Sequence, residues 1–145
     1  MQTHPLLLAQ LAVSGALAGL CWTVQLAVYP QFARVRRAAG AEVFQAFHAA
    51  HTRALGALAG PLMVAELILS LAVAWRVGRT FWTGAGLGLT LATWAWTFAV
   101  MVPRHERLRL AAGAEEAGRL AGWNWPRTAL WTARVGVAAL AAAAG

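Results

Sequence analysis

The chain has 145 residues, of which 60% are hydrophobic and only 12% are charged, and its formal net charge is +7. A mean hydropathy of +0.58, with the apolar residues gathered in long blocks, is typical of an integral membrane protein and excludes an ordinary soluble domain. The positive charge comes from arginines that flank these blocks, so we expect it to mark membrane topology, and we predict no nucleic-acid partner.

Four segments reach the roughly 20 apolar residues that one membrane crossing needs. They cover residues 6–28, 54–75, 81–102 and 126–144. The connections between them are short, which predicts a single all-α domain over residues 1–145, an integral membrane four-helix bundle with up-down-up-down topology. The single cysteine, Cys21, lies in the first segment, so an intramolecular disulfide is excluded.

The arginines are distributed unevenly between the connections. Nine flank the first and third connections, whereas only Arg76 and Arg79 lie in the second. Because positive residues are retained on the cytoplasmic side, this bias predicts a multi-pass protein of a bacterial-type inner membrane. Connections one and three are then cytoplasmic, and both termini lie on the outer side. The lipid bilayer is the first expected partner.

Prolines, glycines and capping residues predict where the helices begin and end. Pro30 and Pro103 follow the first and third segments, and we expect them to close those helices. An amphipathic stretch after Gly40 predicts an early start of the second helix, which then projects into the cytoplasm. Asn124 and Pro126 are expected to open the fourth helix, as N-cap and first-turn residue.

Polar residues recur at helical spacing in several segments, which predicts a polar cleft inside the bundle, open to the cytoplasmic side. In a straight third helix, His105 is less well aligned than the other members of its stripe. The stripes consist of Gln10, Ser14, Cys21, Gln25 and Tyr29 on the first helix, His48 and Glu66 on the second, Thr90, Thr97, Met101 and His105 on the third, and Asn124, Arg127, Trp131 and Arg134 on the fourth.

Glu66 and Arg134 lie near the centres of the second and fourth segments, so we expect them at similar depth. A lone charge at bilayer depth is costly, and pairing lowers that cost. Three roles remain open for this pair: a structural clasp between helices, a group that orients a substrate, or a proton relay.

His48 and His51 are three residues apart near the start of the second helix, where we expect His105 and Glu106 to meet them. Imidazole and carboxylate groups suit iron, copper or zinc, and two histidines suit haem. No HExxH motif or repeated ExxH motif supports such a site. The sequence therefore leaves three alternatives open: a haem, an iron or copper ion, or no cofactor. In the third case the histidines are solvated at the lipid headgroups.

Three short motifs resemble those of the small four-helix membrane proteins of the anthrone-oxygenase-like family. They are AVYPQF after the first segment, MVPRHERL after the third and WNWPRT at the start of the fourth. Members with assigned roles oxidise anthrones to anthraquinones without a bound cofactor. The resemblance implies functional roles for Pro103, Trp123, Asn124 and Arg127, and the His48/His51 pair is not part of the pattern.

The chain is also similar, in size and helix count, to the four-helix haem-binding protoporphyrinogen oxidases. Their first helix carries a histidine, whereas this chain has Gln25 and Tyr29 there. That difference weighs against haem.

These observations predict a small membrane oxidoreductase or oxygenase that acts on a lipophilic aromatic or quinone-like molecule. In this interpretation histidines move a proton, and Asn124 and Arg127 stabilise negative charge on oxygen. The candidate catalytic residues are His48, His51, His105, Asn124 and Arg127, and the candidate substrate-binding residues are Gln25, Tyr29, Glu66, Trp94, Trp131 and Arg134.

Two other functions remain open. One is a non-enzymatic binding or transport unit for an anionic lipophile or for protons. The other is a structural subunit that packs through small-residue faces such as residues 84–89, against another membrane protein. A homo-oligomer is also compatible with the sequence.

Overall fold

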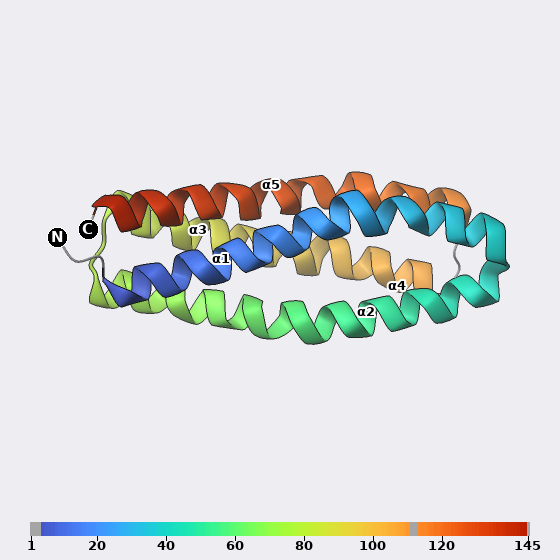
Figure 1. The fold of residues 1–145 in the computed structure, drawn as a ribbon, viewed down its shortest axis with the longest axis horizontal. Coiled ribbons are helices and arrows are strands. Elements are labelled where there is room, and N and C mark those ends of the chain that lie inside the picture. Colours follow the sequence, from blue (N-terminus) through green and yellow to red (C-terminus); the bar gives the residue numbers. More distant parts are fainter. Residues whose placement is uncertain (1–3, 111–112, 145) are drawn as a thin grey trace.

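The computed structural model describes residues 4–110 and 113–144, and this part of the chain is helical apart from short turns (Figure 1). Its elements are α1 (Pro5–Thr23), η1 (Val24–Val28), α2 (Tyr29–Arg76), α3 (Phe81–Trp96), η2 (Thr97–Met101), α4 (Val102–Leu110) and α5 (Ala114–Ala144). The elements η1 and η2 are single π-helical turns. The prediction of an all-helical chain is confirmed.

The chain reverses direction inside α2. Gly40 has φ 84° and ψ −179°, a backbone conformation that is essentially restricted to glycine. Figure 1 shows the helix folding back at this point, where the ribbon is cyan. Residues 29–39 of α2 therefore continue α1 and η1, and residues 41–76 run antiparallel to them. The expected start of a helix after Gly40 is confirmed.

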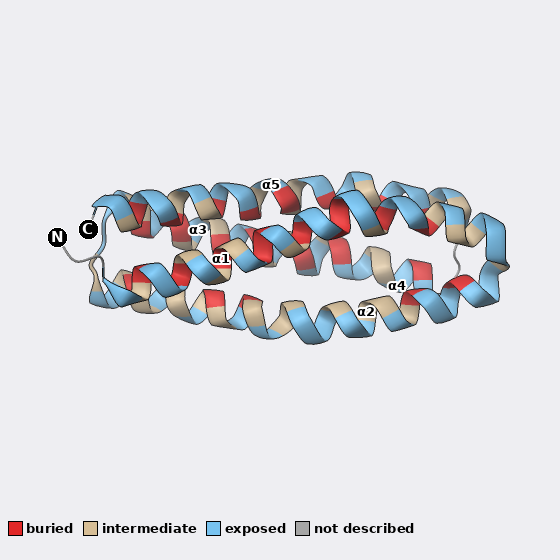
Figure 2. Cartoon of the chain, viewed as in Figure 1, coloured by how far each residue is buried: buried red, intermediate tan, exposed pale blue. Residues whose placement is uncertain are grey.

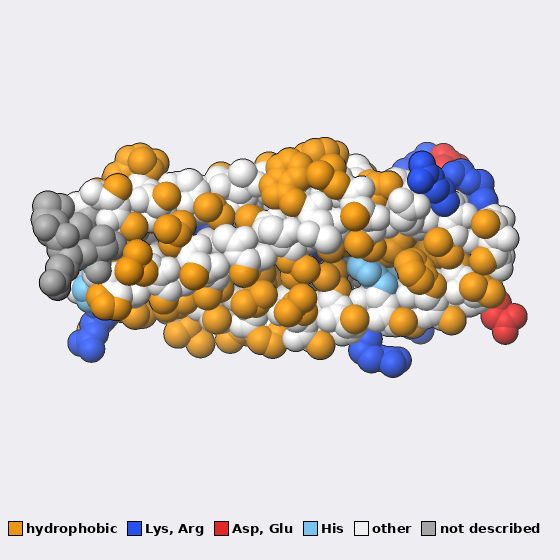
Figure 3. All heavy atoms as spheres, viewed as in Figure 1, with side chains coloured by type: hydrophobic (Ala, Val, Ile, Leu, Met, Phe, Trp, Pro, Cys, Tyr) orange, Lys and Arg blue, Asp and Glu red, His pale blue; other side chains and the backbone are white. Residues whose placement is uncertain are grey.

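The helices form antiparallel arms that lie side by side and cover residues 5–39, 41–76, 81–110 and 114–144 (Figure 1). At about 1.5 Å per residue, each arm is about 45 to 55 Å long. The continuous stretches Pro5–Arg76 and Phe81–Leu110 are long and apolar enough to cross a membrane. Figure 3 shows hydrophobic side chains over the length of the bundle, with charged side chains mainly toward the end that holds the Gly40 bend.

The two prolines that were expected to close helices do not close them. Pro30 and Pro103 both lie inside continuous helix, each directly after a π-helical turn. A proline lacks a backbone N–H, and its ring crowds the carbonyl four residues earlier. The residue before each proline, Tyr29 or Val102, donates its N–H to the carbonyl five residues earlier instead of four. This wider turn accommodates the proline, and the helix continues.

The fourth arm also starts earlier than predicted, at Ala114 instead of Pro126. Asn124 and Pro126 lie inside α5, so the prediction of an N-cap at Asn124 is wrong. Glu115 and Glu116 occupy the first turn instead, where negative charge is favoured by the helix dipole. Asn124 is fully buried, and a helical backbone aims its amide at another helix.

The core consists of the inward faces of the arms, where buried residues recur along each helix (Figure 2). The polar stripe expected on the first helix is buried throughout, and its members are at most 4% exposed. The short second connection is confirmed as well, because α2 ends at Arg76 and α3 begins at Phe81. The Thr80 hydroxyl caps α3 by accepting a hydrogen bond from the Thr83 N–H.

Substitution of Gly40 by alanine should destabilise the protein by about 1 to 3 kcal/mol, because the backbone at this position is strained for any residue with a Cβ. Gly88→Ala is the matched control, since Gly88 is helical and a Cβ there meets no atom within 4 Å. Thermal unfolding in detergent, followed by circular dichroism, measures both. Equal unfolding temperatures for the two variants would contradict the role of Gly40.

Candidate functional site

Buried polar residues gather in three places among the described residues. Two clusters surround Glu66 with Arg134 and His48 with His105, and the third consists of Gln25, Asn124 and Thr128. A cavity adjoins the histidine cluster, and neither Glu66 nor Arg134 lines it. The expected single chamber that holds both the ion pair and the histidines is therefore wrong.

The predicted pairing of Glu66 and Arg134 is confirmed. An Arg134 Nη2 to Glu66 Oε1 distance of 2.8 Å joins two side chains that are at most 1% exposed. Arg134 Nε also donates to Thr90 Oγ1 at 3.1 Å, and the Gln10 amide donates to Ser70 Oγ at 3.1 Å. The Ser70 and Thr90 hydroxyls are 3.1 Å apart. The network thus links α1, α2, α3 and α5.

The guanidinium of Arg134 packs closely against α3. A Cβ added to Gly86 would lie 3.1 Å from Arg134 Nη1, so a side chain at position 86 would force the guanidinium to move by a few tenths of an ångström. The structure supports the first of the three roles considered for the pair, a clasp between helices.

Arg134→Met should destabilise the protein by about 3 to 5 kcal/mol, because it leaves the Glu66 carboxylate buried without its counter-ion. The double variant Glu66→Met/Arg134→Met should recover much of that loss, since no charge remains buried. Chemical denaturation of the purified variants in detergent measures the difference. If the double variant is as unstable as the sum of both single variants, the clasp is not what stabilises this region.

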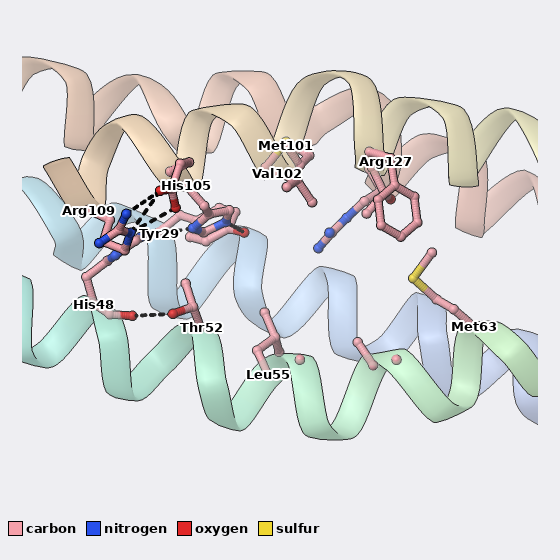
Figure 4. Close-up of a pocket in the computed structure, with 16 residues that line it drawn as sticks. Tyr29, His48, Thr52, Leu55, Met63, Met101, Val102, His105, Arg109 and Arg127 are labelled. Atoms are coloured by element: carbon pink, nitrogen blue, oxygen red, sulfur yellow. Dashed lines mark hydrogen bonds and ion pairs between the residues drawn. The ribbon is translucent and has the colours of Figure 1, made fainter.

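The cavity lies between α2 on one side and η2 with α4 on the other, and its volume is about 360 Å³ (Figure 4). Most of its wall is apolar, including Met63, Phe98, Met101 and Val102. Phe98 and Val102 are 56% and 48% exposed, so the cavity opens at the side of the bundle. A ligand can therefore enter between the helices, in a direction perpendicular to them.

Three side chains form a hydrogen-bonded chain at one end of this cavity. Tyr29 Oη lies 2.9 Å from His105 Nε2, and His105 Nδ1 lies 3.0 Å from His48 Nε2. All three line the cavity, and Figure 4 shows them close together. The π-helical turns account for this meeting. Each turn inserts one residue and rotates the following face by about 100°, which brings Tyr29 and His105 to the inside.

Such a chain can carry a proton without large movement. In one arrangement Tyr29 donates to His105, and His105 donates to His48; in the other, His48 donates to His105, and His105 donates to the Tyr29 oxygen. His48 Nδ1 is buried and has no hydrogen-bond partner among the described residues. It is the free end of the chain, where a proton can be taken up or released.

Burial controls the charge of the central histidine, which lies beyond the end of the third apolar segment. It lowers the pKa of His105 to about 3, and the nearby positive charges of His48, His51 and Arg127 act in the same direction. Burial also lowers the pKa of His48. His105 is therefore neutral at physiological pH, as a group that relays a proton through both ring nitrogens must be.

Arg127 supplies the positive charge of the cavity. Its side chain extends from α5 into the space between α2 and η2 (Figure 4), and it lies within electrostatic reach of Tyr29 and His105. Its Nε is buried and has no hydrogen-bond partner in the part of the chain that the structure describes. An oxyanion in the cavity would satisfy this donor.

Other predicted site residues lie outside the cavity lining. Asn124 Nδ2 donates to Gln25 Oε1 at 2.9 Å, and Gln25 Nε2 donates to the Ala121 carbonyl at 3.0 Å. This pair fastens η1 to α5. Trp131 is buried in an apolar cluster that also contains Met63, with Trp94 packed against it, so the two tryptophans support the cavity from behind.

His51 and Glu106 complete the predicted set. The His51 ring packs edge-on against Phe32, with ring centroids 5.1 Å apart, and does not line the cavity. Glu106 lies at its margin and is paired with Arg109. Sequence periodicity missed Gly56 and Gly60, which line the cavity, although the run of small residues GALAG before Pro61 was visible.

The described residues do not fit the predicted metal set. Among them, no group of three or more histidine, cysteine or acidic side chains is arranged to hold a metal ion. The facing nitrogens of His48 and His105 are bonded to each other, and the Glu106 carboxylate is held by Arg109. We therefore derive no step through a metal or haem.

Comparison of the chain with known protein families, with characterised proteins and with solved structures finds no match. The resemblance to anthrone-oxygenase-like proteins consequently remains a prediction from short motifs, and the site is interpreted from its own geometry.

The stability of the protein should fall as the pH is lowered from about 6.5 toward 3. In this window the unfolded chain binds a proton on His105 that the folded chain does not, so protonation favours unfolding. His105→Gln should flatten this part of the profile, whereas substitution of the exposed His4 by glutamine should not. Unfolding temperatures measured across the pH range provide the check, and an unchanged slope in His105→Gln contradicts it.

Proposed function

We propose that this protein is a small membrane oxidoreductase or oxygenase that takes a lipophilic aromatic or quinone-like molecule from the bilayer into the lateral cavity. The observation that carries the proposal is the Tyr29–His105–His48 chain at the end of an apolar cavity that Arg127 also lines. An apolar pocket with a few convergent polar groups is the usual form of a small-molecule site.

The membrane placement is part of this proposal. Arms of about 45 to 55 Å exceed the roughly 30 Å hydrocarbon core, so part of the bundle extends beyond it. We place that part at the arginine-rich end with the Gly40 bend, on the cytoplasmic side of a bacterial-type inner membrane. The histidine chain then lies near the cytoplasmic headgroups, where protons can be exchanged with water.

The residues suggest how the first chemical step proceeds. The acidic proton of a phenolic or benzylic group passes to His48 Nδ1, and the resulting imidazolium shares its charge with His105 through their hydrogen bond, while Tyr29 keeps its own proton. The substrate keeps the electron pair as an oxyanion, which Arg127 stabilises. Dioxygen dissolved in the bilayer then accepts the electrons, so the protein itself supplies binding, proton transfer and charge stabilisation.

A binding or transport unit for an anionic lipophile is the second candidate. It is favoured by the buried, unpartnered Arg127 Nε, which a bound oxyanion satisfies whether or not a reaction follows. In this case the histidine chain only adjusts the charge of the site. The two candidates differ in whether the bound molecule is converted.

Arg127→Gln should weaken binding of an ionisable hydroxyanthrone by about tenfold to a hundredfold, the usual range for a lost hydrogen bond to a charged group. His105→Gln should slow conversion by roughly a hundredfold with less effect on binding, because it removes the proton relay. Absorption spectra and oxygen uptake of protein in lipid nanodiscs measure both quantities.

The control is Arg119→Gln, because Arg119 is exposed and paired with Glu115. It should behave like the unmodified protein in both measurements. Binding without conversion supports the second candidate. If the probe neither binds nor reacts, or binds Arg127→Gln equally well, the proposal fails.

A further inference from the structure

The cavity is long and narrow, with the Tyr29–His105–His48 chain at one end and Arg127 partway along it (Figure 4). Its residues on α2 run from His48 to Met63, a distance of about 22 Å along the helix. In Figure 4, His48 and Met63 lie at opposite ends of the cavity, with His105 beside the former. A volume of about 360 Å³ distributed over this length leaves a narrow slot. A compact ring system would occupy only part of it.

One wall of the slot is formed by Gly56 and Gly60, which are one turn apart on α2 and both line the cavity. Neither has the positive φ that requires glycine, which among the described residues is found at Gly40 and Gly78. A Cβ at either position meets no atom within 4 Å. Close packing between the helices of this chain therefore does not explain them.

Glycine in a helix interior costs roughly 1 kcal/mol relative to alanine. Gly56 and Gly60 differ from other open helical glycines such as Gly88 because they line the cavity, and with the small Ala59 they keep the wall between Leu55 and Met63 low. Side chains at these positions would divide the slot into two short pockets. The wall is thus suited to a straight, flexible apolar chain.

The rim of the slot is apolar apart from the Glu106–Arg109 ion pair near its histidine end. Phe98 and Val102 are exposed at its opening, on the face that contacts lipid if the bundle spans the membrane as proposed. An apolar chain can lie along the slot and leave through this opening into the bilayer, while a polar head stays at Arg127 and the histidines. No charged group of the slot lies beside Gly56 or Gly60 on α2.

We propose that the molecule bound here is an elongated amphiphile, with a quinone- or phenol-type head at the Tyr29–His105–His48 end and an alkyl or isoprenoid tail along the Gly56–Gly60 wall. This inference rests on the proposed function and specifies its substrate class. It assigns Gly56 and Gly60 as the residues that select for the tail.

The test compares two ligands with the same naphthoquinol head, one with a decyl tail and one with a methyl group in its place. Affinities are measured in lipid nanodiscs at equal mole fractions in the bilayer. A tail leaves lipid for a similarly apolar slot, so only packing contributes, and we expect the tailed ligand to bind at least threefold more tightly.

Gly60→Leu should abolish this preference by weakening binding of the tailed ligand more than binding of the methyl ligand, because the new side chain fills the slot where the tail lies. Gly60→Ala, a smaller change, should reduce the preference partly. Gly88→Leu is the matched control, since a Cβ at Gly88 also meets no atom within 4 Å and Gly88 does not line the cavity. It should retain the full preference.

The outcomes separate the two proposals. If neither ligand binds, the proposed function fails, and this inference fails with it. If both ligands bind equally and Gly60→Leu changes neither affinity, the proposed function stands and the tail site is refuted. If Gly60→Leu instead alters the oligomeric state, measured by light scattering in detergent, the Gly56–Gly60 wall is a contact between copies of the chain, and the inference is overturned.

Discussion

The missing backbone N–H groups of Pro30 and Pro103 are the constraint on which the site depends. Each proline removes one backbone hydrogen bond from its helix, and each follows a π-helical turn, across which the helix continues. The inserted residue rotates the next face, and Tyr29 and His105 consequently point toward each other from different arms. The same local feature, used twice, assembles the hydrogen-bonded chain.

The cluster around Glu66 and Arg134 and the cluster around the histidines differ in how closely they are packed. The network around Glu66 and Arg134 is densely packed, and its guanidinium packs closely against Gly86. The histidine cluster adjoins an open slot, and polar atoms such as Arg127 Nε and His48 Nδ1 have no partner within the described residues. The ion pair and its hydrogen bonds hold the helices together, and one of the two carboxylate oxygens, Glu66 Oε2, has no hydrogen-bond partner among the described residues. Free donors and acceptors next to a cavity, by contrast, are available to a ligand.

This division explains how a small bundle can combine stability with a binding site. The clasp ties α1, α2, α3 and α5 together through buried hydrogen bonds and an ion pair, and the Gln25–Asn124 contact adds a second attachment. The cavity separates α2 from η2 in the part of the bundle between the clasp and the histidine cluster. The small residues Gly56 and Gly60 then keep the space between them free of side chains.

Sequence by itself determined the helical class, the antiparallel order and the inward polar stripes, because apolar length and helical periodicity are local properties. It also placed Glu66 and Arg134 at matching depth, since two charges within apolar segments have few alternatives to pairing. The continuation of helices through Pro30 and Pro103 became visible only in the structure, because a proline after an apolar segment fits both a helix end and a π-helical turn. The position of Asn124 inside α5 and the lateral opening of the cavity depend on how arms distant in sequence pack together, and no local pattern encodes that packing.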